Sequence, residues 1–198
     1  MSAERKPIVT PDALVSPRRT FLKQTSLISL GIAAAAGLAS SSAVAGMTMS
    51  KSTDNDINIL NTALGLEYQA IAAYQVGADS GLLEKKVYDV AVEFQSQHRA
   101  HAGVLSSTVT KLGGQPVQPK KPKAYDFPVS SLKNQADVLT FAAGLEKGAA
   151  SAYLGAVPVF HNRDLAKAAA SILGDETMHW AVLLSALGKN PVPVAFIA

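Results

Sequence analysis

The sequence predicts an all-α protein, a four-helix bundle of two related antiparallel hairpins with one long crossover. Three observations predict this fold: four long segments with apolar residues at helical spacing, short connections within two pairs of them, and a repeat that relates the pairs. The chain has 198 residues and no cysteine, so any metal must be held by histidine and carboxylate side chains.

Residues 1–45 indicate a twin-arginine signal peptide. The pair Arg18-Arg19 is followed by Thr-Phe-Leu-Lys, a modestly apolar stretch at 27–38, and the small-residue tripeptide at 43–45. This order of charge, apolar run and A-x-A site resembles signals of the twin-arginine export pathway. The apolar stretch is shorter than the roughly 20 residues that span a bilayer, so we expect cleavage before Gly46 and no stable membrane span afterwards. The alternative is an uncleaved leader kept as a weak anchor.

The predicted mature chain is electrically balanced. The whole sequence has 18 basic and 15 acidic residues, and 13 of each remain once the leader, with five basic and two acidic residues, is removed. The basic character of the precursor therefore belongs to its export signal, and nothing indicates a nucleic-acid partner. We expect a periplasmic or secreted location. The 153 residues from position 46 onward suffice for one domain with a hydrophobic core.

Four segments predict helices because they contain few breakers and repeat apolar residues every three or four positions. They are residues 54–77, 82–112, 134–157 and 163–187. Residues 46–53 would form a linker before the bundle at 54–188. The apolar, proline-containing residues 189–198 would form an extended tail.

The connections between these helices predict their arrangement. Short links at 79–81 and 158–162 make two antiparallel hairpins, whereas residues 113–133 form a long polar stretch with four prolines. About 20 residues at roughly 3.3 Å each can run the length of a helix and start the second hairpin parallel to the first.

A repeat relates the two hairpins. The pattern A-x-G-L-E-x-x-A-x-x-A-Y occupies residues 63–74 in the first helix and 142–153 in the third, with every specified residue identical at an offset of 79. A fainter echo at an offset of 78 aligns H-x-x-H at 98–101 with E-x-x-H at 176–179. The hairpins are therefore related halves.

Polar members of the repeat interrupt apolar stripes that should face the core. Glu67, Glu146 and the pair Glu176 and His179 lie on such stripes, as does His101. A buried ionised carboxylate costs several kcal/mol unless it is paired or bound to metal, and these stripes carry no Lys or Arg. A metal ion is the best source of the missing positive charge.

Spacing along each hairpin brings these residues to one level. The midpoint between Glu146 and the pair at 176 and 179 falls near residue 162, in the predicted turn. The midpoint between Glu67 and the pair at 98 and 101 falls near residue 83. Residues three apart share a helix face, so each pair can direct two ligand atoms to one site.

These residues resemble the ferritin-like di-metal carboxylate bundles. In that family, one Glu from each of two helices and a Glu-x-x-His from each of the other two hold two metal ions. The resemblance covers residues 54–188 and implies a divalent metal, with iron or manganese favoured and zinc as an alternative. The implied metal ligands are Glu67, His98, His101, Glu146, Glu176 and His179.

His98 departs from the family pattern, which places Glu at this position. The change lowers the ligand charge by one and makes a mononuclear site, a zinc site or a pair of unequal metals more credible than a standard dinuclear iron centre. The leader suggests the secreted branch of the family, which includes desiccation-related proteins.

Simpler structural roles remain open for these residues. A buried Glu can accept a hydrogen bond from a tyrosine, and Tyr68, Tyr74 and Tyr153 are available. A single helical histidine is usually a packing or surface residue. Glu93 lies roughly 80° around the helix from the predicted site, so we expect it at the surface or beside a ligand. We expect no chemistry from His161, which falls in a turn.

Two functions follow from these expectations. The first is an exported ferritin-like metal-binding protein whose intrabundle Glu/His site performs redox or reactive-oxygen chemistry, with Tyr74 or Tyr153 as a partner. The alternative is a non-catalytic or metal-free bundle with a role in stress protection or as a partner subunit. The sequence leaves a homo-oligomer open.

Overall fold

The computed structural model describes residues 41–198, with side chains from residue 51 onward except at position 122. The described residues form four long helices and no strand, so the predicted all-α bundle is confirmed. The helices are α2 (Ser41–Asp79), α3 (Lys85–Lys111), α4 (Gln135–Ala156) and α5 (Arg163–Ala186). Short 3-10 helices in the connections are η2 (Pro122–Ala124), η3 (Val129–Ser131) and η4 (Val157–Val159). Residues 1–40 of the predicted export signal lie outside the described part of the chain.

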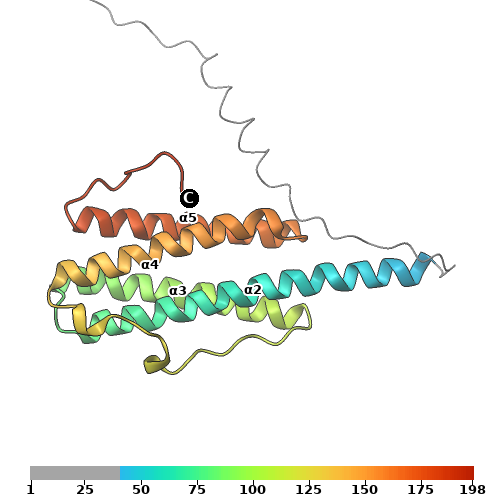
Figure 1. Ribbon diagram of the computed structural model, residues 1–198, viewed down its shortest axis with the longest axis horizontal. Helices are drawn as coiled ribbons and strands as arrows, with labels where there is room; N and C mark the ends of the chain where they lie inside the picture. Colours follow the sequence, from blue (N-terminus) through green and yellow to red (C-terminus); the bar gives the residue numbers. More distant parts are fainter. Residues whose placement is uncertain (1–40) are drawn as a thin grey trace, which may run out of the picture. The chain divides into compact units, whose positions relative to one another are not determined.

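The four helices form two hairpins, α2 with α3 and α4 with α5, and α2 also packs against α4. The connection between the hairpins returns along the bundle, so α4 starts at the end where α2 finishes (Figure 1). The single crossover is as predicted, but the predicted parallel orientation of the second hairpin is wrong, because the connection carries the chain back to the end where α2 finishes. The crossover makes α2 and α4 antiparallel neighbours, and these two helices carry the two copies of the identical repeat.

Helix ends follow local side-chain chemistry. The Asn134 side chain accepts the backbone N–H of Asp137 at 3.0 Å, and the Asn162 side chain accepts that of Asp164 at 2.8 Å. Caps of this kind contribute about 1 kcal/mol each by satisfying a free N–H of the first turn. Beyond the end of α5, Gly188 has a φ of 68°, a left-handed conformation that glycine adopts without a steric penalty.

Helix α2 starts earlier than the sequence predicts. Its first residue is Ser41, so residues 46–53 continue the helix and do not form the expected linker. The segment contains no proline, and the acidic residues near position 54 do not start the helix. Asp56 is instead buried, and its carboxylate accepts the backbone N–H groups of His161 at 2.8 Å and Asn162 at 2.9 Å. This side chain ties α2 to the turn before α5.

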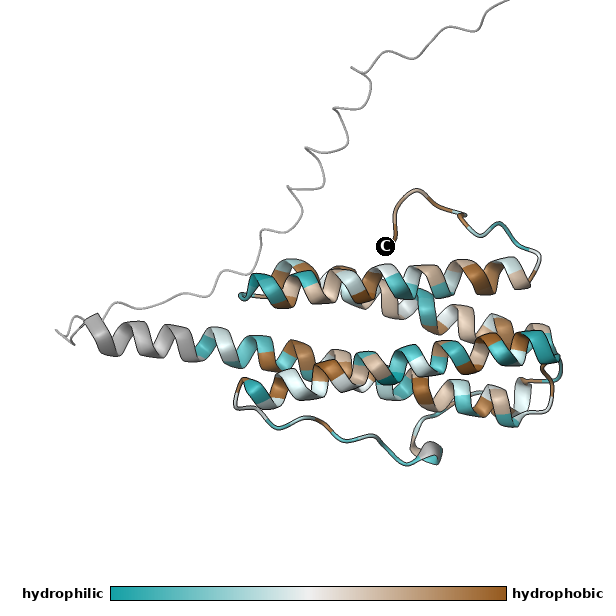
Figure 2. Cartoon of the chain, turned by 180° about the vertical axis from the view of Figure 1, so that it is seen from behind, coloured by the Kyte–Doolittle hydropathy of each residue, from teal (hydrophilic) through white to brown (hydrophobic). Residues whose placement is uncertain are grey.

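Two apolar clusters fill the bundle, one toward each end of the helices. The first includes Leu64, Val109 and Ile172, and the second includes Phe94 and Leu183. Figure 2 shows apolar and polar residues alternating along each of the four helices. Burial of the apolar surface of the clusters stabilises the fold by roughly 25 cal/mol for each Å² removed from water. The clusters leave a polar layer between them.

The C-terminal residues 189–198 lie along the bundle without regular structure. Ile197 packs against the second apolar cluster, and the Ser151 hydroxyl donates to the Ala198 carbonyl at 2.7 Å. Within the described residues, no helix combines the length and apolar character needed to cross a bilayer.

Candidate metal centre

The structure brings all six predicted ligands together in the polar layer between the apolar clusters. Helix α2 supplies Glu67, α4 supplies Glu146, and α3 and α5 each supply two residues three positions apart. Five of the six side chains are at most 2% exposed, and His101 is 15% exposed. The equal distances of these residues from their turns, visible in the sequence, are the reason that they meet at one level.

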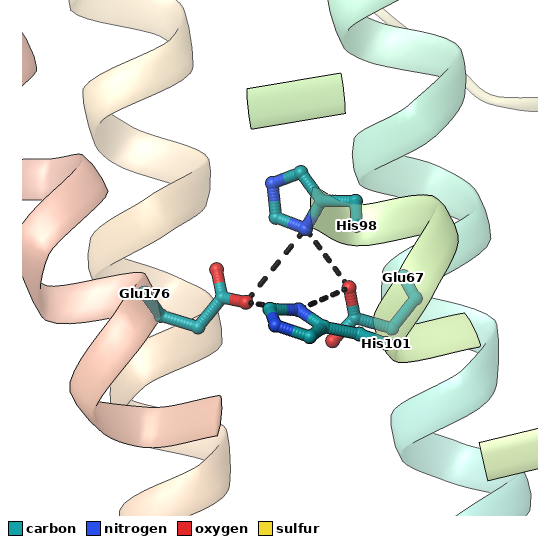
Figure 3. A group of neighbouring side chains, drawn as sticks. All are labelled: Glu67, His98, His101 and Glu176. Atoms are coloured by element: carbon teal, nitrogen blue, oxygen red, sulfur yellow. Dashed lines mark hydrogen bonds and ion pairs between the residues drawn. The ribbon is translucent and has the colours of Figure 1, made fainter. Parts of the chain in front are cut away.

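One half of the cluster joins Glu67, His98, His101 and Glu176, shown in Figure 3. The Nδ1 atom of His98 lies 2.8 Å from Oε2 of Glu67, and Nδ1 of His101 lies 3.5 Å from the same oxygen. Glu176 closes this half through Oε1, which is 3.2 Å from Nδ1 of His101. One atom from each of the four side chains falls within 4.8 Å of all the others.

The other half joins His98, Glu146, Glu176 and His179, and all four are buried. Here His98 uses its second nitrogen, Nε2, which lies 3.2 Å from Oε1 of Glu146. Nδ1 of His179 is 3.4 Å from Oε2 of Glu146 and 3.8 Å from Oε2 of Glu176. His98 and Glu176 therefore belong to both halves, whereas each remaining residue belongs to one.

Two tyrosines from the repeat cross between the hairpins to hold the outer carboxylates. The hydroxyl of Tyr74 on α2 donates to Glu146 on α4. The hydroxyl of Tyr153 on α4 donates to Oε1 of Glu67 on α2 at 2.5 Å. The sequence offered these tyrosines as carboxylate partners, and the repeat explains the exchange because each Glu-Tyr pair is seven residues apart on antiparallel helices.

Gln97 and Asp175 also contact the cluster, and sequence reasoning missed both contacts. Oε1 of Gln97 lies 2.6 Å from Nε2 of His179, and Oδ2 of Asp175 lies 3.2 Å from Nε2 of His101. Gln97 directly precedes the H-x-x-H segment, and Asp175 directly precedes the E-x-x-H segment. The two residues are therefore equivalent positions of the repeat, at the same offset of 78, and this signal could have identified them. Glu93 is exposed, as expected.

These outer contacts orient the histidines. Because Nε2 of His101 and of His179 faces an oxygen outside the cluster, Nδ1 of each ring faces the carboxylates inside it. Partners of this kind fix the ring orientation of metal-binding histidines. The side chain of His161 is exposed in its turn and belongs to neither half of the cluster.

The histidines carry positive charge in the protein without metal. Burial lowers the pKa of His98, but hydrogen bonds to Glu146 and Glu67 outweigh it and raise that pKa to about 10. Burial also opposes protonation of His101 and His179, yet the neighbouring glutamates raise the pKa of each to about 9. Protons thus balance the carboxylates when no metal does.

The pKa values of the three carboxylates shift in different directions. Burial raises the pKa of Glu67 and of Glu146, but hydrogen bonds from the histidines lower both below the usual range. The pKa of Glu176 is raised because burial outweighs its contacts with His101 and His179. Burial and the adjacent carboxylates raise the pKa of Tyr74 and of Tyr153, so both hydroxyls remain donors.

The residues present fit a divalent metal. Five buried side-chain atoms of the described residues have no hydrogen-bond partner, and all belong to this cluster. They are Nδ1 of His101 and His179, Oε2 of Glu146, and both carboxylate oxygens of Glu176. Buried polar atoms are otherwise nearly always paired, so a cluster of unpaired nitrogen and oxygen atoms indicates a missing cation.

Comparison with known families agrees with this geometry. Residues 55–189 match the family model described as a ferritin-like domain. The chain belongs to the ferritin-like domain family. A search among curated proteins found no match.

Several solved structures are similar to this ferritin-like chain. A conserved hypothetical protein from Mycobacterium tuberculosis is 22% identical with a TM-score of 0.62, covering 73% of this chain and 99% of its own. A ferritin-like, diiron-carboxylate protein from Bacillus anthracis is 21% identical with a TM-score of 0.56, covering 69% and 97%. A dodecameric thioferritin, a bacterioferritin-related protein from Bacteroides fragilis, is 25% identical with a TM-score of 0.59, covering 69% and 86%. These likenesses show the fold, and the Glu/His cluster that could bind divalent metal is found in this chain's own residues.

Proposed function

We propose that this ferritin-like protein is exported and binds divalent metal at its intrabundle centre, where it performs redox chemistry on reactive oxygen species. The observation that carries the proposal is the gathering of five buried nitrogen and oxygen atoms without a hydrogen-bond partner in one layer of the bundle. Histidine and carboxylate ligands suit iron and manganese, with zinc as the alternative.

The chain's own residues have separate roles in this proposal. Glu67 and His101 would hold one metal position, and Glu146 and His179 the other. Glu176 would serve both positions because its two oxygens face the two halves. A bound iron or manganese ion would supply one-electron chemistry toward dioxygen, peroxide or superoxide.

The surrounding residues would keep that chemistry inside the bundle. Tyr74 and Tyr153 hold the outer carboxylates in place and lie next to the site, where a tyrosine can donate a proton or an electron. The apolar clusters on both sides exclude water, which strengthens the interactions between charged groups at the centre.

Export and assembly complete the proposal. The Arg18-Arg19 pair and the A-x-A site support secretion through the twin-arginine pathway, in the branch with stress-related members. Cleavage before Gly46 would remove only the first five residues of α2. Because a similar protein is a dodecamer, we propose that this chain also forms a homo-oligomer.

A metal-free structural role is the second candidate, and one observation favours it. His98 stands where the family has a carboxylate, and its two nitrogens contact Glu67 and Glu146 at the same time. A protonated His98 therefore neutralises part of the cluster without metal. In this case the bundle would serve stress protection or act as a partner subunit.

Metal content of single variants tests the proposal. His101→Ala and His179→Ala should each lower the metal measured by elemental analysis, because Nδ1 of each ring faces the carboxylates. His161→Ala is the matched control, since this histidine lies in an exposed turn. Equal metal content in all four proteins, wild type included, would overturn the assignment of His101 and His179 as ligands.

The export proposal has its own test. Lysine at both positions 18 and 19 should block export, and the exported wild type should begin at or next to Gly46. Mass spectrometry of the exported protein measures the start directly. An exported chain that retains residues 1–45 would overturn cleavage.

A further inference from the structure

The predicted metal ligands are sealed from solvent on every side except one. Five of the six are at most 2% exposed, and His101 alone reaches 15%. An ion that enters the folded bundle must therefore pass beside His101, unless the helices separate.

A groove leads to this histidine. It lies between α3 and α5, has a volume of about 580 Å³, and is open to solvent. Its walls include small or exposed residues of both helices beside His101. Among them are Ala100, Val104, Ser171, Gly174 and Met178.

The inner end of the groove carries a negative group. Asp175 is 25% exposed, and its Oδ2 atom lies 3.2 Å from Nε2 of His101 and 3.6 Å from Nε2 of His179. No Lys or Arg is among the residues that line the groove. The Asp175 carboxylate, which pairs with His101 in the metal-free protein, offers an oxygen ligand to a cation that enters the groove.

We propose that this groove is the passage through which divalent cations reach the centre, with the His101–Asp175 pair closing its inner end. The inference rests on the proposed metal binding and adds the route of entry. Asp175 meets the incoming cation first because it is the more exposed member of the pair.

The apolar cavity at the other end of the bundle does not fit this role. Its volume is about 70 Å³, and it is enclosed by residues such as Tyr74, Val90 and Leu139. None of the six predicted ligands lines it. A hydrated cation would lose its water there without gaining a charged partner, which is unfavourable.

Gly174 offers a direct way to close the groove. A Cβ atom added at this helical glycine meets no atom within 4 Å, so we expect the larger side chain of Gly174→Phe to occupy the passage. Gly148 on α4 is also helical, exposed and free of nearby atoms, and it lines none of the cavities described above. Gly148→Phe is therefore the matched control.

The experiment follows Co²⁺ uptake by the metal-free full chain in a stopped-flow instrument, using the visible absorbance of bound cobalt. We expect Gly174→Phe to load about tenfold more slowly than wild type, which corresponds to about 1.4 kcal/mol on the barrier. Its final cobalt content should equal that of wild type, because the ligands are unchanged. Gly148→Phe should load at the wild-type rate.

Ser171→Phe repeats the test from one turn earlier on α5, in case Gly174→Phe does not fold by circular dichroism. Wild-type loading rates in both groove variants would overturn this route while leaving the metal site in place. Absence of cobalt from wild type at equilibrium would instead overturn the proposed metal binding, and the route with it.

Discussion

The two hairpins of the bundle are built alike and differ at one decisive position. Each contributes a Glu and a tyrosine from its repeat, and a second pair of residues from its other helix. The first hairpin has His98 where the second has Glu176. His98 brings positive charge to the centre, whereas Glu176 has two buried oxygens without a hydrogen-bond partner.

The presence of His98 in place of a second glutamate makes the contributions of the two hairpins to the site chemically different. His98 reaches the outer carboxylates of both hairpins with its two nitrogens, and Glu176 reaches the histidines of both. The two central residues therefore connect the halves, while the four outer residues each serve one half. Predictions that separate central from outer residues test this account most strongly.

The largest effect should come from Glu176→Gln. This residue belongs to both halves of the cluster, so the variant should lose metal from both positions, whereas Glu67→Gln should lose it from one. Removing a residue that only hydrogen-bonds to a metal ligand lowers metal affinity by roughly 10- to 100-fold. Because Glu176 and Glu67 are themselves predicted ligands, each variant should lose more affinity than that. Metal titration measures both variants. Glu93→Gln, at an exposed position of α3, is the control and should behave as wild type.

Equal losses in Glu176→Gln and Glu67→Gln would contradict the division into central and outer residues. The same titration would then indicate a single metal position shared by all six side chains.

The second prediction concerns pH and the metal-free protein. The pKa values of His98, His101 and His179 are raised from 6.5 to about 10, 9 and 9. The stability that these charges give is complete below pH 6.5 and is lost as the pH rises through 9 and 10. The urea midpoint of the metal-free protein should therefore fall between pH 6.5 and 9.

Metal should remove this trend, because a bound histidine is already deprotonated. Urea unfolding with saturating Co²⁺ should show a flatter pH profile than the metal-free protein. Parallel profiles would mean that the histidines do not take part in metal binding.

Much of this arrangement could be predicted from the sequence. The repeat and the turn midpoints predicted that all six residues meet, and the structure brings them together. The early start of α2 was missed because the apolar spacing used to predict the helix begins near residue 54, whereas the helix already includes residues 46–53. Gln97 and Asp175 were missed because helical rotation places them beside the core stripe, and their contacts depend on how α3 approaches α5.

The two tyrosines provide a smaller and symmetric test. Tyr74→Phe and Tyr153→Phe each remove a hydrogen bond to a buried carboxylate, so each should lower the free energy of unfolding by about 1.5–3 kcal/mol. Tyr68→Phe is the control, since Tyr68 only packs beside the first apolar cluster, and its effect should stay within about 0.5 kcal/mol. Chemical denaturation measures all three. A large loss in only one of the two tyrosine variants would break the symmetry between the hairpins.

The smallest effect on metal binding is expected from His98→Glu, which makes the two hairpins alike. A carboxylate can bridge two metal ions, so the variant should bind the second metal more tightly, by about tenfold or 1.4 kcal/mol. Without metal it should be less stable than wild type, because a positive group is replaced by a negative one among buried carboxylates. Metal titration of the wild type and of His98→Glu, side by side, measures this difference in affinity. Identical stoichiometry and affinity would remove His98 from the site and leave five ligands.

The central claim is that the Glu/His cluster of this ferritin-like bundle holds metal, and locating the metal tests it most directly. Crystals of the protein grown with Fe²⁺, Mn²⁺ or Co²⁺ would be measured at the absorption edge of the metal. The account predicts anomalous density inside the cluster, within bonding distance of Glu176 and of Nδ1 of His101 or His179. Density only at surface groups such as His161, with none between the four helices, would contradict it.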